Sequence, residues 1–345
     1  MTLDWLLRSG RTACIAFAMA AATATGNAVA IAADSAVILQ YHRFGEDAYP
    51  STSVTIDQFE AHIEHLTSGG YTVLPVPEIL DALRGGGPLP DRTVGITVDD
   101  ATRSTFIEAW PRFEKADFPF TVFVSTDPVD QGHAGIMSWD QLRELVAAGV
   151  TVGNHGAAHG RMWQNDDAAS RVDLEKARRR IQEELGIDAA LFAYPYGEWN
   201  SDLRALVEEL GFAAAFGQHS GVVGAHTDTL NLPRFALNEN YGDIDRFKLI
   251  ADTLPLGARA VTPADQLLTE NPPTVGFTIE PPLANRDSLT CFASGGVGAT
   301  LDHQEGSRVK VTLDRAFPPG RARLNCTAPA GGGRWHWFGL QFVAP

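Results

Sequence analysis

The chain has 345 residues, of which 44% are hydrophobic, and this is enough for a large core with a smaller appended domain. Its 27 basic and 42 acidic residues give a formal net charge of −15 at pH 7. Because such a charge repels the phosphates of nucleic acids, the composition argues against a nucleic-acid partner and is compatible with a neutral or partly cationic polymer.

The first 33 residues resemble a cleavable secretory signal peptide. Arg8 and Arg11 provide a short basic region, residues 13–22 form an apolar stretch, and small residues follow at 28–30 and 30–32. The apolar stretch is too short to favour the alternative of an uncleaved membrane anchor, and no later segment is apolar enough to cross a bilayer. We therefore expect an exported protein, periplasmic or extracellular, without stable membrane insertion.

Residues 34–263 alternate short apolar runs with amphipathic stretches. The apolar runs are 37–39, 71–74, 94–98, 120–124, 150–152, 191–193 and 212–216, and the amphipathic stretches include 56–67, 139–148, 168–185 and 201–210. Continuous apolar strands that alternate with helices are typical of a parallel sheet or barrel covered by helices. About seven such units predict an α/β fold of the distorted (β/α)7-barrel type.

Residues 264–345 show a different sequence pattern, with Gly/Pro turns between short alternating strands and no helical period. The predicted strands are 275–279, 309–313 and 338–343, which suit a small β-sandwich domain. Cys291 and Cys326 are the only cysteines outside the signal peptide, and in an oxidising compartment we expect them to form one disulfide, with two free thiols as the alternative. Trp335 and Trp337 alternate as strand residues do, which favours packing over sugar binding.

Polar residues follow most of the strands predicted in the first domain. The groups are Tyr41-His42, Asp99-Asp100, Asn154-His155 with His159 after it, Tyr194 to Gly197, and Gln218-His219. The carboxyl ends of parallel strands share one edge of a sheet, and active sites are built there. The sequence therefore predicts a functional site at this edge.

A metal site is predicted from the residue types at this edge. Asp100, His155 and His159 make a three-ligand set with open positions, which is typical of a catalytic rather than a structural metal. Taken alone, an Asp pair is more often a helix N-cap, and two histidines can simply face solvent. Position 156 is Gly rather than Glu, which excludes the His-Glu-x-x-His metalloprotease arrangement and leaves Asp99 as the expected base. Zinc is the expected ion, with cobalt, nickel and iron as alternatives by ligand type.

At these residues the chain resembles the polysaccharide deacetylase family, the carbohydrate esterases built on the NodB-type domain. The family motif Thr-Phe-Asp-Asp-Gly stands at 97–101 as Thr-Val-Asp-Asp-Ala. The His-Ser/Thr-x-x-His motif stands at 155–159 as His-Gly-Ala-Ala-His, and Arg-x-Pro-Tyr stands at 193–196 as Ala-Tyr-Pro-Tyr. The three motifs follow one another in family order within residues 37–241.

The resemblance implies a role for each matching residue. Asp99 corresponds to the catalytic base, and Asp100, His155 and His159 correspond to the metal ligands. Tyr196 falls in the groove-forming motif, where a backbone amide holds the oxyanion. Aromatic residues near these motifs could stack on sugar rings, although packing is the commoner role for any one of them: Tyr41, Trp163, Tyr194, Tyr196 and Trp199.

The chain also departs from the family pattern. Ala193 replaces the arginine that orients the base, but the branch acting on β-1,6-linked poly-N-acetylglucosamine often lacks it too and carries a Tyr-His pair near the first strand. His42 therefore joins Tyr194, Tyr196 and Trp199 as an expected substrate-binding residue. The late Leu-x-His motif that supplies the general acid is absent, and His219 is the candidate substitute, with an ordinary loop histidine as the alternative. Ala101 in place of Gly puts the backbone geometry of its loop in question.

We therefore expect an exported, metal-dependent enzyme that removes N-acetyl groups from an N-acetylglucosamine polysaccharide. Poly-N-acetylglucosamine with β-1,6 linkages is one candidate substrate, and peptidoglycan or chitin-like oligomers are the alternatives. A non-catalytic glycan-binding protein on the same fold is the competing hypothesis from another class. Ala193 and the missing late motif support it, whereas the intact Asp-Asp and His-His set argues against it.

Overall fold

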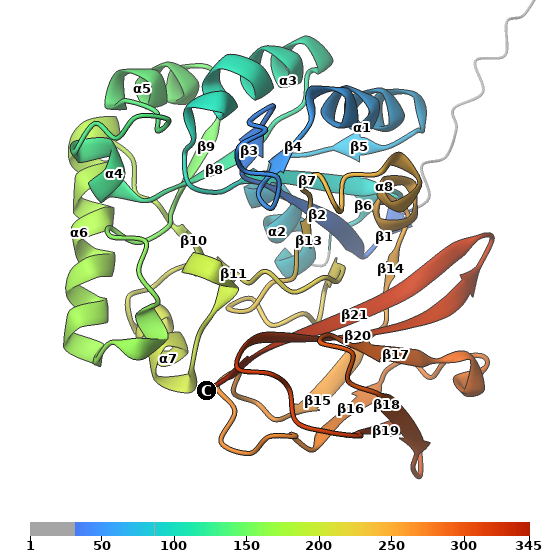
Figure 1. The fold of residues 1–345 in the computed structure, drawn as a ribbon. Coiled ribbons are helices and arrows are strands. Elements are labelled where there is room, and N and C mark those ends of the chain that lie inside the picture. Colours follow the sequence, from blue (N-terminus) through green and yellow to red (C-terminus); the bar gives the residue numbers. More distant parts are fainter. Residues whose placement is uncertain (1–31, 86) are drawn as a thin grey trace, which may run out of the picture. The chain divides into compact units, whose positions relative to one another are not determined.

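A computed structural model of the protein describes residues 32–85 and 87–345, so nearly all of the predicted signal peptide lies outside the described residues (Figure 1). The described residues belong to one compact unit. Within them, every helix is too short or too polar to span a bilayer.

The central element is a curled, mainly parallel sheet. Its strands run in the order β11-β10-β9-β8-β7-β2-β12, and β13 and β5 pair with β2 and β7. Their bounds are β2 Ser35–Tyr41, β5 Thr72–Val73, β7 Thr93–Val98, β8 Thr121–Val124, β9 Thr151–Asn154, β10 Leu191–Ala193, β11 Ala214–Phe216, β12 Val223–Gly224 and β13 Phe235–Ala236. Every residue of β2, β7 and β8 is buried, as expected for parallel strands covered on both faces. The predicted α/β fold of the distorted barrel type is confirmed, in the form of a curled sheet.

Eight α-helices cover this sheet within the described residues, and Figure 1 shows α1, α3 and α5 along its upper side and α6 and α7 on the left. The helices are α1 Ile56–Ser68, α2 Val76–Gly85, α3 Trp110–Ala116, α4 Thr126–Asp130, α5 Trp139–Ala147, α6 Asp167–Leu185, α7 Ser201–Glu209 and α8 Ile244–Ala251. The starts of α1 and α5 are fixed by capping boxes at Thr55 and Ser138. Two short strand pairs lie outside the main sheet, β1 Ala32–Ala33 with β6 Leu89–Pro90 and β3 Arg43–Phe44 with β4 Ser53–Val54.

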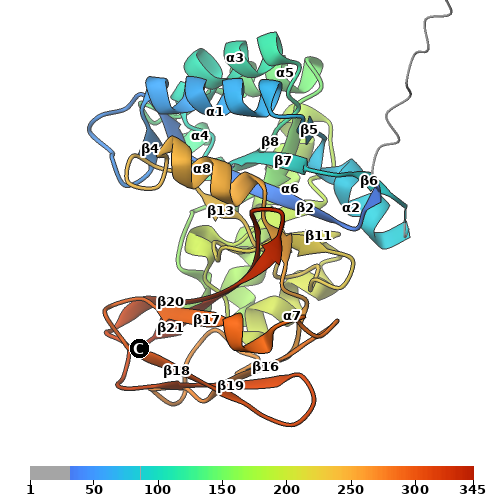
Figure 2. The same ribbon diagram turned by 90° about the vertical axis from the view of Figure 1, so that its right-hand side faces the viewer.

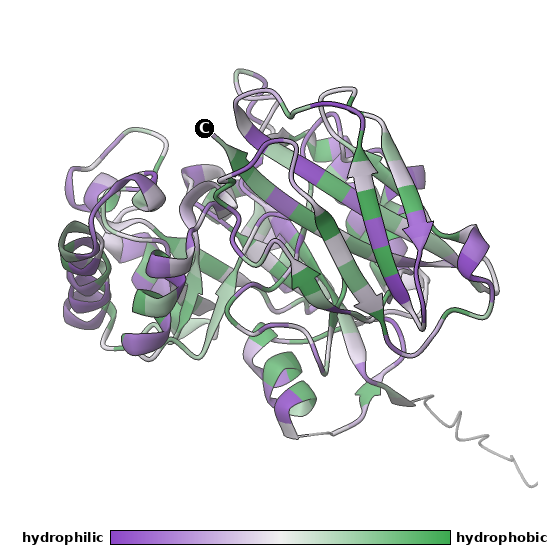
Figure 3. Ribbon diagram, turned by 90° about the horizontal axis from the view of Figure 1, so that it is seen from below, coloured by the Kyte–Doolittle hydropathy of each residue, from purple (hydrophilic) through white to green (hydrophobic). Residues whose placement is uncertain are grey.

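Two four-stranded sheets form the C-terminal sandwich, and Figure 2 shows them stacked. One sheet consists of β14 Leu254–Pro255, β21 Arg334–Ala344, β20 Gly320–Gly331 and β17 Thr290–Ala293, and the other of β15 Ala258–Thr262, β16 Val275–Ile279, β19 Arg308–Leu313 and β18 Ala299–His303. Hydrophobic and hydrophilic residues alternate along these strands in Figure 3, and the inward ones build a core of their own around Phe277, Val311 and Leu324.

The predicted disulfide is present between Cys291 and Cys326, which face each other directly on β17 and β20. Strand pairing in the C-terminal sheets already begins at Leu254, because β14 pairs with β21 and β15 pairs with β16. The domain boundary at 263/264 stays a prediction from composition, and residues before it contribute strands to both C-terminal sheets.

Candidate metal centre

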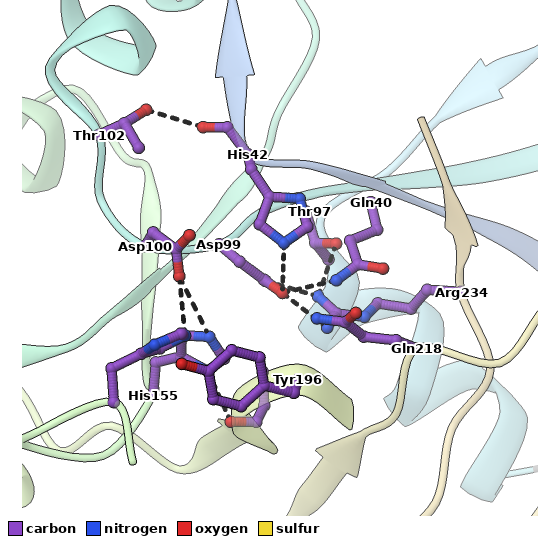
Figure 4. A network of polar contacts seen from close by, with 12 residues as sticks. Gln40, His42, Thr97, Asp99, Asp100, Thr102, His155, Tyr196, Gln218 and Arg234 are labelled. Carbon is purple, nitrogen blue, oxygen red and sulfur yellow. Dashed lines mark hydrogen bonds and ion pairs between the residues drawn. The ribbon is translucent and has the colours of Figure 1, made fainter. Parts of the chain in front are cut away.

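The polar groups predicted at the carboxyl edge of the sheet converge there from four strands (Figure 4). His42 follows β2, and Asp99 and Asp100 follow β7. His155 follows β9, and Tyr196 lies in the turn after β10. Because β2, β7, β8, β9 and β10 are parallel neighbours, each chain leaves the sheet at the same edge, which brings the side chains together.

Asp100, His155 and His159 form a cluster that fits a divalent cation. One ligand atom from each residue lies within 4.8 Å of the other two. The Nε2 atoms of His155 and His159 lie 3.5 and 3.1 Å from Oδ1 of Asp100, yet the buried Nε2 of His155 and Oδ1 of Asp100 make no hydrogen bond. Buried polar atoms that face a common point without pairing are the arrangement that a metal ion satisfies.

The orientation of His155 also suits a ligand. Its Nδ1 lies 2.7 Å from the carbonyl oxygen of Ala193, and a proton on Nδ1 that donates to this carbonyl leaves the Nε2 lone pair directed at the cluster. The ring is fully buried, so this hydrogen bond fixes it in one orientation. Position 193, where the family arginine is missing, thus contributes to the site through its backbone.

The loop that carries Asp100 adopts the left-handed backbone conformation. Asp100 and Ala101 have φ of 72° and 52°, and His159 has φ of 55°. Residues other than glycine adopt this region at a cost of about 1–3 kcal/mol each, and such strain gathers at functional sites. Thr102 supports the loop by donating from Oγ1 to the carbonyl oxygen of His42 at 2.7 Å. Ala101 therefore takes up the conformation for which glycine is the easier residue.

Asp99 is a fully buried carboxylate with two partners that the sequence did not reveal. Arg234 donates from Nη1 to Oδ1 at 2.7 Å and from Nη2 to Oδ2 at 2.9 Å, and Gln40 donates to Oδ2 at 2.7 Å. Burial raises the pKa of Asp99, but the Arg234 guanidinium, His155 and His42 together lower it by more, so the pKa is about 2. Asp99 is therefore ionised at neutral pH, as a general base must be.

Replacing Arg234 with methionine should lower the free energy of unfolding by about 3–5 kcal/mol, because it leaves the buried Asp99 carboxylate without its cation. Chemical denaturation at neutral pH measures the change. Arg204→Met is the matched control, since it breaks an exposed two-pronged pair with Asp228, which is expected to contribute no more than about 1 kcal/mol. Equal losses in the two variants would contradict the importance assigned to the buried pair.

His42 faces the same carboxylate from β2. Its Nε2 lies 3.9 Å from Oδ2 of Asp99, and its side chain keeps 14% of its surface exposed. Burial lowers its pKa, and the two carboxylates at 99 and 100 oppose that shift. His42 thus stands between the buried base and the solvent-facing side of the centre.

Tyr196 lies over the cluster from the other side. Its ring centroid is 4.7 Å from that of His159, and its backbone is left-handed with φ of 61°. Within the described part of the chain its N–H donates to no protein acceptor, so this amide is free to serve an oxyanion. Gly197 follows it with φ of 67°, and a Cβ there would lie 2.5 Å from the backbone nitrogen of Gln218.

Three of the expected site residues do not reach the metal edge. Tyr194 is fully buried and donates its hydroxyl to the carbonyl oxygen of Leu230 at 3.1 Å, so its ring cannot stack on a sugar. Trp199 is 3% exposed, and its Nε1 donates to Asn231. Trp199 and His219 line a separate cavity of about 1200 Å³ beside β14 and β21, to which neither Asp99 nor any of the three metal ligands contributes.

His219, the general-acid candidate from the sequence, lines this cavity, and its role in the reaction stays a prediction. Among the described residues no hydrogen bond or ion pair joins its ring to the cluster, and the charges that act on it come from Arg234, Arg323 and Asp228. Burial and the two arginines lower its pKa to about 4, so the ring is neutral at pH 7. Outside the metal ligands, His42 is the histidine that lies near the base, with Nε2 3.9 Å from Oδ2 of Asp99.

Comparison with known proteins agrees with this geometry. A family profile described as polysaccharide deacetylase matches residues 86–215, which include Asp99, the three metal ligands and Tyr196. The chain is 22% identical over 175 residues to the putative polysaccharide deacetylase YxkH of Bacillus subtilis, covering 51% of this chain and 61% of that protein. It is also 22% identical over 247 residues to the poly-β-1,6-N-acetyl-D-glucosamine N-deacetylase of Escherichia coli, covering 59% of this chain and 37% of that enzyme.

Solved structures share the fold at low sequence identity. The deacetylase PplD of Streptococcus pyogenes, solved with acetate, superposes with a TM-score of 0.59 at 20% identity over 63% of this chain and 98% of that one. IcaB of Ammonifex degensii superposes with a TM-score of 0.58 at 24% identity over 64% of this chain and 99% of that one. The chain spans less than two thirds of the length of the curated relatives it matches, so their whole activities do not carry over.

Proposed function

From the match of residues 86–215 to the polysaccharide deacetylase family, we propose that the chain is a metal-dependent enzyme that hydrolyses N-acetyl groups of a polysaccharide. The observation that supports this most strongly is the pairing of two features within one edge of the sheet. One is the Asp100, His155 and His159 cluster, in which the buried Oδ1 of Asp100 and Nε2 of His155 make no hydrogen bond, and the other is the ionised, buried carboxylate of Asp99 beside it.

A divalent cation held by the three ligands would act as a Lewis acid, polarising the acetamide carbonyl and lowering the pKa of water toward ~7. Asp99 takes a proton from the attacking water, and Arg234 and Gln40 keep its carboxylate in one orientation. The free N–H of Tyr196 donates to the oxyanion as the carbonyl carbon becomes tetrahedral, and one such donor contributes about 3–4 kcal/mol. Acetate and a glucosamine unit are the products.

We assign the general acid to His42 rather than His219. His42→Gln should lower acetate release by roughly 10²–10⁴-fold, the range for loss of a general acid. His219→Gln is the matched control and should leave acetate release within a few-fold of the original, because the ring of His219 lines the separate cavity beside β14 and β21. A larger loss of acetate release in His219→Gln than in His42→Gln, measured in steady-state assays, would assign the general acid to His219 instead.

The competing hypothesis of a non-catalytic glycan-binding protein loses most of its support. It rested on the missing arginine at Ala193 and on the missing late motif. Arg234 reaches Asp99 from the segment before β13 and supplies a guanidinium to the base. His42, whose Nε2 lies 3.9 Å from Oδ2 of Asp99, is our proposal for the acid. The contact of Arg234 answers the first objection, and the proposed role of His42 would answer the second.

Among substrates, we propose a polymer of N-acetylglucosamine, with β-1,6-linked poly-N-acetylglucosamine as the first candidate. The Tyr41-His42 pair and the similarity to the Escherichia coli enzyme support this choice. Export of the enzyme, predicted from residues 1–33, would bring it to such extracellular or periplasmic polymers. Zinc remains the proposed ion, with cobalt, nickel and iron as alternatives for two His and one Asp.

The test is acetate release by the purified protein from β-1,6-linked N-acetylglucosamine oligomers, chitin oligomers and peptidoglycan fragments. We expect release from the β-1,6-linked oligomers to be fastest. Faster release from another glycan would change the substrate that we propose but would leave the proposed reaction, N-deacetylation, in place. No release from any of the three by protein shown to contain bound metal would overturn the proposed activity.

A further inference from the structure

The C-terminal sheets hold a segment of the candidate active centre. The segment is the turn at 194–198, and Tyr196 within it carries both the ring over His159 and the free backbone N–H. Tyr196 is not a glycine, yet its φ of 61° and ψ of 3° lie in the left-handed region. That conformation costs about 1–3 kcal/mol and persists only where the surroundings impose it. The groups that impose it are therefore part of how the site is built.

Within its own segment Tyr196 has little support. Gly197 donates its N–H to the carbonyl oxygen of Tyr194 at 2.8 Å, and Glu198 donates its N–H to the carbonyl oxygen of Pro195 at 3.2 Å. Neither bond involves a backbone atom of Tyr196 itself. The carbonyl oxygen of Tyr196 must find its donors elsewhere in the chain.

Those donors come from the C-terminal sheets. Gln341 on β21 donates from Nε2 to the carbonyl oxygens of Tyr196 at 3.2 Å and Gly197 at 2.8 Å. Arg321 on β20 donates from Nη1 to the carbonyl oxygen of Tyr196 at 3.3 Å. Gln341 is 2% exposed, so its amide is fixed in place and water cannot readily replace it.

The buried carboxylate of Glu198 contacts the residues that surround Tyr196. The side chain of Glu198 has no exposed surface and accepts from Nη1 of Arg161 at 2.5 Å and from Nε1 of Trp163 at 2.9 Å. Nε of Arg321 approaches the same carboxylate at 3.6 Å. The Arg161 guanidinium also lies over the ring of Tyr196, 4.7 Å from its centroid. Backbone and ring of Tyr196 are thus each held by an arginine that is bound to Glu198.

We propose that Arg321 and Gln341 are positioning residues, through which the C-terminal sheets hold Tyr196 in the left-handed conformation that places its N–H and ring at the metal centre. This inference rests on the proposed deacetylase function and gives the C-terminal sheets a part in it. The sheets then act as a wall of the active centre rather than as a separate carbohydrate-binding module. Loss of either donor relaxes Tyr196 without disturbing Asp100, His155 or His159.

The test compares three variants of the full chain. Gln341→Met and Arg321→Met remove the donors to Tyr196, whereas Arg334→Met removes an equivalent contact of β21 far from the turn, to the carbonyl oxygen of Asp252 and to Asp91. We expect kcat to fall at least tenfold in the first two variants, with metal content and KM within two-fold of the original. Arg334→Met should keep the original kcat, and Arg321→Lys, which retains a donor, should lose less than Arg321→Met.

A second readout does not depend on activity. In hydrogen exchange, peptides covering residues 194–198 should exchange faster in Gln341→Met and Arg321→Met than in the original protein and in Arg334→Met. Unchanged exchange of this segment in the first two variants would overturn the inference, as would unchanged kcat. An original protein that releases no acetate from any glycan would instead overturn the proposed function, while the exchange data would still decide the placement of Tyr196.

Discussion

Asp99→Asn should lower acetate release by roughly 10²–10⁴-fold and leave the metal content of the protein unchanged. The asparagine amide keeps the size of the carboxylate but cannot accept a proton from water. Asp99 is also not among the three residues whose atoms converge on the metal position. Acetate assays paired with elemental analysis of the same samples measure both expectations.

The substitution also removes the charge that neutralises the buried Arg234 guanidinium, so its effect on folding has to be separated from its effect on chemistry. Thermal unfolding should show that the variant is folded at the assay temperature. Asp228→Asn serves as the control, because it removes a carboxylate from an exposed arginine pair and should leave acetate release unchanged. If the Asp99→Asn variant is folded, contains bound metal and keeps full activity, Asp99 is excluded as the base.

His155→Ala should instead lose the metal and, with it, the activity. The substitution removes one of three ligand atoms and also the hydrogen bond to the carbonyl oxygen of Ala193 that orients the ring. Loss of even an outer partner of a metal ligand typically weakens binding 10–100-fold, and loss of the ligand itself should do more. After dialysis, the variant should contain less than a tenth of the metal bound by the original protein.

His155 is fully buried, so alanine at this position also leaves a cavity. His159→Ala is the second variant, because that side chain keeps 25% of its surface exposed and its removal disturbs the core less. Both variants should lose metal, whereas His226→Ala, outside the cluster, should keep it. One ion per chain in either ligand variant would contradict the assignment of that residue.

The strands and helices of the main sheet could be predicted because local signals determine them. Continuous apolar runs gave β2, β7 and β8, which are buried along their whole length. Helix ends were predicted to within one residue where amphipathic period and capping agree, as in α1, whose predicted range of 56–67 compares with an observed Ile56–Ser68. The strands observed at the apolar runs 71–74 and 212–216 are shorter than the runs themselves, because only Thr72–Val73 and Ala214–Phe216 pair with neighbouring strands.

The metal cluster could also be predicted, because its residue types and spacing restrict the chemistry. The partners of Asp99 could not. Arg234 is 135 residues away along the chain and lies in no motif, and only the pairing of β13 with β2 brings it to the base. The contacts of Gln341 and Arg321 with Tyr196 span more than 120 residues and depend on how β20 and β21 meet the turn after β10.

The sequence placed too many aromatic and histidine residues at the metal edge for a related reason. Position after a strand predicts the edge of the sheet, but not the side of the loop on which each side chain lies. Tyr194 and Tyr196 are two residues apart, yet one packs into the core and the other lies over His159. His219 comes three residues after β11 and lines the cavity beside β14 and β21, to which none of the three metal ligands contributes.

Acetate release from β-1,6-linked N-acetylglucosamine oligomers, followed while zinc is titrated into chelator-treated protein, tests the central claim most directly. The account predicts no release without metal, recovery in proportion to bound zinc, and saturation at one ion per chain. The same release by metal-free protein would contradict it, as would a protein that binds one ion in the Asp100, His155 and His159 cluster and releases no acetate from any N-acetylglucosamine polymer.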